Sequence, residues 1–154
     1  MLPSIRVQAE DFDPGAEVDA LAAGRRDVGA VASFTGYCRD EEGRLAALEL
    51  EHYPGMAEAE LGRVAAEAAA RWPLIGLTVV HRHGAIPPGG RIVLVAAASR
   101  HRDAAFGAAE FLMDFLKTRA PFWKREHLAD GTRGGWVEAS LKDDAATDRW
   151  RAEP

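Results

Sequence analysis

The segment RIVLVAAAS (91–99) constrains the fold more than any other part of the chain. All seven residues between Arg91 and Ser99 are apolar, so an extended backbone here has no face suited to water. We therefore expect a central strand of a sheet, covered by a helix. That helix is predicted at 102–119, where apolar residues recur with the 3.6-residue helical period: Ala104, Ala105, Ala108, Phe111, Leu112 and Phe115.

Further strands and helices are predicted around this strand. A second helix is expected at 56–72, where strong helix formers lie between Pro54-Gly55 and Pro73. The strands occur in hairpin-like pairs, such as 77–84 with 91–99 through the turn AIPPGG, rather than in strict alternation with helices. This order favours an α+β fold with a mainly antiparallel sheet covered by helices. Alternating apolar residues predict the other strands at 4–9, 29–36, 45–52, 122–127 and 134–140.

Length and composition favour one domain spanning 1–154, with a flexible tail at about 143–154. No apolar run reaches the ~18 residues that cross a bilayer, and the first residues lack the basic start and apolar stretch of a secretion signal. Cys38 is the single cysteine, so it forms no internal disulfide, which fits a reducing compartment. We expect a cytoplasmic protein that does not contact membranes.

The charge is distributed unevenly along the chain. The formal net charge is -5, yet residues 81–125 contain eight basic and three acidic side chains, which leaves -10 for the remainder. A local basic region in an acidic protein suits a small phosphate-bearing ligand or an acidic peptide tail better than a duplex. A solvated basic helix face is the alternative.

Lysine is rare in this chain, which has three lysines and sixteen arginines, and two of the three lie in LKTRAPFWKRE (116–126). A guanidinium is always protonated, whereas an ammonium can lose its proton and take part in amine chemistry. Lys117 is expected at the end of a helix and Lys124 in the strand after Pro121, so the two come from different elements that meet at a corner. The alternatives are chance, or lysine stems that pack over Phe122 and Trp123.

Other candidate ligand-binding residues flank the helices and strands. His101 and Arg102 begin the helix at 102–119, where free backbone N–H groups and arginine favour phosphate, although Arg102 can equally pair with Asp103. Arg39 follows a strand and reaches either a ligand or only solvent. His81 and His83 have no third ligand at a recognisable spacing, so no metal site is predicted.

Over most of its length the chain resembles the large, catalytic subunit of molybdopterin synthase. The segments FTGYCRD, LELEHYPGM, HRHGAIPPGG, SRHRDAAF, FLKTRAPFWKRE and WVEA occur in the order and spacing of that family. The resemblance implies an α/β-hammerhead type of fold and a sulfurtransferase without a cofactor. In that family a homodimer binds two small ubiquitin-like carrier subunits, giving a heterotetramer. The carrier's C-terminal Gly-Gly thiocarboxylate donates sulfur to cyclic pyranopterin monophosphate, which produces the molybdopterin dithiolene.

The resemblance also implies roles for individual residues. Lys117 contacts the carrier's terminal carbonyl and the reacting carbon, while Lys124 donates or accepts a proton and steadies the phosphate. The family's pocket positions that hold the phosphate and pterin, or form the walls, correspond to Arg39, His101, Arg102, Phe34 and Met113.

One departure and two alternatives remain open at this point. Some relatives have a basic residue directly after WVEA that reaches the partner protomer, and here that position is Ser140, with Arg133 a few residues upstream. A different lysine enzyme would form a Schiff base through Lys117. A binding module for single-stranded nucleic acid would stack bases on Phe122 and Trp123, but the acidic net charge leads us to expect no nucleic acid partner.

Overall fold

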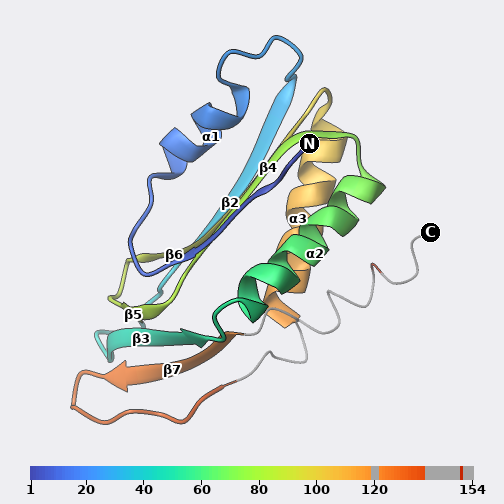
Figure 1. Ribbon diagram of the computed structural model, residues 1–154. Coiled ribbons are helices and arrows are strands. Elements are labelled where there is room, and N and C mark those ends of the chain that lie inside the picture. The colour runs from blue at the N-terminus through green and yellow to red at the C-terminus, as the bar shows by residue number, and fades with distance from the viewer. Residues whose placement is uncertain (119–121, 138–149, 151–154) are drawn as a thin grey trace.

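A four-stranded sheet and a three-stranded sheet organise the computed structural model, which describes residues 1–118, 122–137 and 150 (Figure 1). The larger sheet has the order β1-β4-β6-β2, formed by Ser4–Gln8, Leu74–Arg82, Arg91–Ser99 and Ala30–Tyr37. The smaller sheet has the order β5-β3-β7, formed by Gly84–Ile86, Leu45–His52 and Phe122–Leu128. Only the pairing of β1 with β4 is parallel, so the predicted α+β fold with mainly antiparallel sheet is confirmed.

The apolar strand β6 is central, as its sequence predicted. It lies between β4 and β2, and its residues from Val93 to Ser99 are all buried. Helices α2 (Met56–Arg71) and α3 (Arg102–Thr118) lie side by side on one face of the sheet, where Val95 and Ala97 join the main core (Figure 1). The opposite face packs Leu94 against Phe12, just before α1 (Pro14–Ala22), which covers that side. Since both faces are covered, no polar residue is needed along β6.

The connection between β4 and β6, which includes the segment AIPPGG, also contributes a short strand to the smaller sheet. β4 and β6 do pair antiparallel, as expected for a hairpin. Between them, however, Gly84–Ile86 leaves the larger sheet as β5 and pairs with β3 in the smaller one. Gly84 has a φ of 90°, a conformation that side-chain-bearing residues rarely adopt, and it makes this change of sheet possible. The chain therefore passes directly from the larger sheet into the smaller one at Gly84.

The prediction of a strand at 134–140 is wrong for residues 134–137, the part of this segment that the structure describes. Val137 and Arg133 form only isolated bridges, to Lys124 and His127 of β7. The pair Gly134-Gly135 between them has no side chains to pack on a neighbouring strand, which weakens a ladder. Residues 138–140 lie outside the described residues.

The tail predicted to be flexible is described only at Trp150. Its indole lies edge-on to Trp72 and Phe111 and donates a hydrogen bond to the carboxylate of Asp114. Its carbonyl accepts a hydrogen bond from Arg71. Trp150 thus contacts both α2 and α3.

Among the described residues, no helix is both long and apolar enough to cross a membrane.

Two helical glycines provide a test of the packing between α3 and the chain after α2. A Cβ on Gly107 would lie 2.7 Å from Nε1 of Trp72, whose ring is held by Phe111 and Trp150, so Gly107→Ala overpacks this contact. We expect the free energy of unfolding to fall by about 1–3 kcal/mol. Gly62→Ala in α2 meets no atom within 4 Å and is expected to raise it by about 0.5–1 kcal/mol through helix propensity. Urea unfolding of both variants measures the difference, and equal effects would contradict this packing.

Candidate functional site

Lys117 and Lys124 converge on one small cavity. Lys117 lies in the last turn of α3, and Lys124 lies in β7 directly opposite Leu50 of β3. Both lysines line a cavity of about 120 Å³. Its other described lining residues are mostly apolar: Leu48, Leu50, His81, Ile92, Val93, Met113, Leu116, Phe122 and Val137. The predicted meeting of the two elements at a corner is confirmed.

A larger cavity of about 690 Å³ adjoins the small one and shares both lysines. Arg39, Arg44 and Arg125 also line it. Arg39 is exposed and pairs with the equally exposed Glu41 at 3.2 Å, an arrangement that contributes little stability and leaves the guanidinium accessible. Carboxylates of Asp40, Glu41 and Glu126 also line this cavity. The small cavity therefore opens into a wider, strongly charged recess.

The two predicted wall residues have different positions. Met113, on α3, lines the small cavity one turn before Lys117. Phe34, on β2, lies opposite Val95 and is 43% exposed. Phe34 is not among the described residues that line either lysine cavity.

His101 and Arg102 are not brought to the lysines within one chain. Arg102 begins α3 and His101 directly precedes it, whereas Lys117 lies in the last turn of α3. With a rise of 1.5 Å per residue, Arg102 and Lys117 are separated by roughly 22 Å along the helix axis. Both residues are exposed. A single copy of the chain therefore places them at a separate surface.

Arg133, considered as a substitute for the basic residue that some relatives have after WVEA, lies apart from the cavity. Arg133 bridges His127 near the far end of β7 and is not among the described lining residues of either lysine cavity. Ser140 lies outside the described residues.

His81 is a cavity residue that the sequence pattern did not identify, because the pattern suggested only a metal ligand. It is 8% exposed and its ring stacks on Phe122, with centroids 3.7 Å apart and planes at 14°. Its Nδ1 lies 2.8 Å from the carbonyl oxygen of Arg82 and donates to it. Burial lowers the pKa of His81 to about 4, so the ring is neutral at neutral pH. The available signal was an ionisable residue directly after the apolar pair Val79-Val80 in β4.

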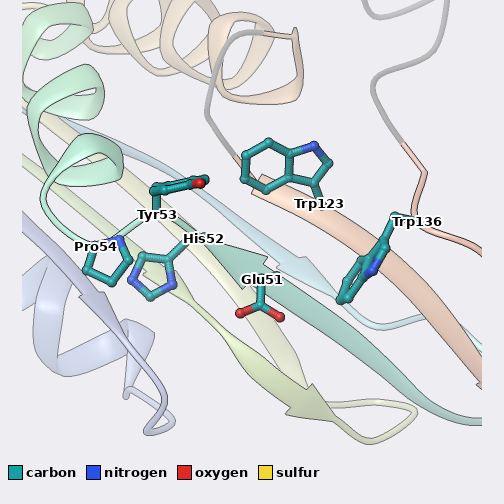
Figure 2. A pocket seen from close by; sticks show the side chains of 6 residues that line it. All are labelled: Glu51, His52, Tyr53, Pro54, Trp123 and Trp136. Carbon is teal, nitrogen blue, oxygen red and sulfur yellow. The ribbon is translucent and has the colours of Figure 1, made fainter.

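The opposite face of the smaller sheet has an aromatic surface without lysine (Figure 2). Here Glu51, His52, Tyr53, Pro54, Trp123 and Trp136 line a further cavity of about 690 Å³. Arg125 is engaged on this side, since its guanidinium lies 4.1 Å from the centre of the Trp136 ring and Nε donates to Glu49 at 2.9 Å. Hydrogen bonds from His127 and Arg125 hold the pKa of Glu49 below its usual range. The groups suited to amine chemistry therefore lie on the other face.

Cys38 is a buried thiol rather than an accessible one. It packs with Leu50 and Ile86, and desolvation raises the pKa of the thiol. A raised pKa reduces the thiolate that would act as nucleophile.

Comparison with known proteins identifies the family. Residues 7–119 match the family described as MoaE protein. The chain is 66% identical over 152 residues to the molybdopterin synthase catalytic subunit of Mesorhizobium japonicum, covering 99% of this chain and 96% of that one. It is 64% identical to the subunit of the same name from Brucella melitensis, covering 96% of this chain and 90% of that one.

Solved structures agree with this match. The molybdopterin biosynthesis MoaE protein of Burkholderia ambifaria superposes with a TM-score of 0.83 at 50% identity, covering 98% of this chain and 99% of that one. Molybdopterin synthase from Staphylococcus aureus gives a TM-score of 0.74 at 31% identity, covering 84% and 95%. The family model, the curated relatives and the solved structures therefore agree on one family. The chain belongs to the MoaE family, which confirms the resemblance noted in its motifs.

The neutral state of His81 predicts a pH-dependent stability. The ring has a pKa of about 4 when folded and an ordinary value of 6.5 when unfolded, so between these values only the unfolded chain binds the proton. The stability contributed by neutral His81 is complete above pH 6.5 and is lost as the pH falls towards 4, by on the order of 3 kcal/mol.

Urea unfolding at several pH values measures this effect. His81→Asn removes the titrating ring, so its free energy of unfolding should fall less steeply than that of the wild type between pH 6.5 and 4. His83→Asn serves as the control and should retain the wild-type slope. Equal slopes for the wild type and His81→Asn would show that His81 does not remain neutral.

Proposed function

We propose that this chain is the catalytic subunit of molybdopterin synthase and acts as a sulfurtransferase. It transfers sulfur from the C-terminal thiocarboxylate of a small carrier subunit to cyclic pyranopterin monophosphate, forming the dithiolene of molybdopterin. The observation that carries the proposal is the convergence of Lys117 and Lys124 on one apolar cavity at the end of a charged recess. Membership of the MoaE family supports it.

The small cavity suits the carrier's Gly-Gly terminus. Its volume of about 120 Å³ has little room for side chains, and glycine has none. Its apolar lining, with Leu50, Ile92 and Met113, lowers the local dielectric and strengthens the attraction between an ammonium and a thiocarboxylate. Lys117 then faces the terminal carbonyl. After the sulfur has bonded to the pterin, water adds to this carbonyl and Lys117 stabilises the negative charge on its oxygen. Cleavage of the C–S bond leaves the sulfur on the pterin and a carboxylate on the carrier.

The larger cavity suits the phosphorylated heterocycle. Its volume of about 690 Å³ is in the range of small-molecule sites. Arg39 offers the planar, bidentate donors that phosphate prefers. Lys124 lines both cavities, so it is placed to contact the phosphate and to donate or accept a proton at the reacting carbon.

A separate carrier protein is the expected partner. A solved complex of subunits 1 and 2 of the molybdopterin-converting factor from Helicobacter pylori has this chain's fold, with a TM-score of 0.69 at 19% identity. That complex supports a two-subunit assembly here. The reaction is proposed to take place in the cytoplasm.

A second copy of this chain is proposed to complete the site. His101 and Arg102 lie one helix length from Lys117, so they reach the lysines only from another protomer. Large apolar side chains are exposed near this surface, with Phe106 on α3 63% and Phe34 on β2 43% exposed. Such residues are typical of a protein interface. A homodimer with two carriers forms the heterotetramer, in which Phe34 contributes to the pocket wall.

The first test removes one lysine. Lys117→Ala should reduce dithiolene formation to background in a mixture of chain, thiocarboxylated carrier and pyranopterin, because the charge on the carbonyl oxygen loses its ammonium partner. Thermal unfolding and carrier binding should remain close to wild type, since Lys117 is exposed. Arg63→Ala, which removes an exposed cation of α2 paired with Glu60, serves as the control and should retain activity. Turnover by Lys117→Ala at the wild-type rate would refute the assignment.

The second test addresses the shared site. Lys117→Ala and Arg102→Ala should each be inactive alone, whereas a mixture that exchanges protomers contains dimers with one intact site. Equal mixing should restore about a quarter of the wild-type activity, because half of the dimers are mixed and half of their sites are intact. If activity stays absent after exchange of protomers has been verified, Lys117 and Arg102 of the same protomer serve one site, and the proposed shared site is refuted.

A further inference from the structure

The small cavity contains two donors of hydrogen bonds and one side-chain acceptor. Among the described residues that line it, the polar side chains are Lys117, Lys124 and His81. A lysine ammonium donates and cannot accept. His81 is therefore the lining side chain that can orient an ammonium by accepting a hydrogen bond from it.

The contacts of His81 determine which ring nitrogen accepts. Nδ1 lies 2.8 Å from the carbonyl oxygen of Arg82, an acceptor, so Nδ1 has the hydrogen. The other nitrogen, Nε2, consequently has the lone pair. The stack on Phe122 at 3.7 Å and the pairing of His81 with Val93 of β6 fix the orientation of the ring.

The charge state of His81 matches an acceptor rather than a base. Burial lowers its pKa to about 4, and the positive charge of Lys117 opposes protonation further. A ring with so low a pKa does not remove a proton from an ammonium at neutral pH, but its lone pair stays available. The cavity thus avoids a third positive charge beside the two lysines.

We propose that His81 is a positioning residue for Lys117, whose ammonium donates a hydrogen bond to Nε2 and is thereby directed at the reacting carbonyl in the small cavity. This inference rests on the proposed function. Lys117 is an exposed side chain with many rotamers, and one fixed acceptor selects among them when the carrier terminus enters. The His81 ring also stacks on Phe122 of β7, which shares one face of that strand with Lys124. His81 therefore contacts the strand that positions Lys124.

Two substitutions separate this role from a purely structural one. Asparagine has its amide near the position of Nδ1, so His81→Asn keeps the donor to Arg82 but removes the acceptor. Glutamine extends an amide oxygen towards the position of Nε2, so His81→Gln keeps an acceptor but not the donor to Arg82. A structural role predicts that His81→Asn is the milder change, and a positioning role predicts that His81→Gln is.

Steady-state kinetics of sulfur transfer provide the first measurement. His81→Asn should lower kcat about 10- to 100-fold with KM for the pyranopterin unchanged, as expected for the loss of one charged hydrogen bond. His81→Gln should recover most of the lost kcat despite a lower melting temperature. His83→Asn, which changes a neighbouring histidine outside the lining residues, should match wild type. Wild-type kcat in His81→Asn, or equal losses in both His81 variants, would overturn the inference.

Nuclear magnetic resonance of the complex with carrier provides a measurement that does not depend on turnover. The chain has three lysines, so 13Cε-lysine labelling gives three assignable signals. In His81→Asn the Lys117 signal should shift and its order parameter should fall, while that of Lys142 stays unchanged. An unchanged Lys117 signal would overturn the inference, whereas absence of sulfur transfer by the wild type would overturn only the proposed function. If His81→Asn does not fold, His81→Gln decides, because loss of Lys117 order in that variant contradicts the proposal.

Discussion

The pairing of β7 with β3 is the constraint on which the lysine cavity depends. The register places Lys124 opposite Leu50 and Trp123 opposite Glu51. Because side chains alternate between the faces of a strand, a slip of one residue would exchange the two sets. Lys124 would then join the aromatic surface, and the indole of Trp123 would face Lys117. The ion pair of Glu49 with Arg125 and the hydrogen bond of Glu49 with His127 help to hold this register from the other face.

The placement of charge follows the difference between arginine and lysine. Arg125 has a structural role against Glu49 and Trp136, and Arg71 makes structural contacts in α2. The two described lysines instead line the small cavity, whose described lining residues include no arginine. A guanidinium suits permanent pairing because it stays protonated, and an amine suits a reacting centre because its proton is exchangeable. The neutral His81 completes this division by adding an acceptor without adding charge.

Most of the fold was predictable because local patterns determine it. The apolar run of β6 predicted its central position, and the helical period predicted α3 and its buried face. The pairing of Gly84–Ile86 with β3 was not predictable, since three residues are too short to show a period and the partner lies far away in sequence. For the site, proline geometry predicted that the lysines meet at a corner. The distance of His101 from them follows from helix length, and the role of His81 depends on tertiary contacts with Phe122 that no local pattern contains.

The arrangement of the two sheets has a consequence for the energetics of the whole molecule. The chain passes from β4 of the larger sheet to β5 of the smaller one at Gly84, and the small cavity lies in the crease between the sheets, with His81 and Val93 on one side and Leu48 and Leu50 on the other. A molecule seated in this crease touches both sheets at once. Such a molecule binds only while the two sheets are together, so binding opposes their separation. The protein's melting temperature should therefore rise with occupancy of the crease, even when no reaction follows.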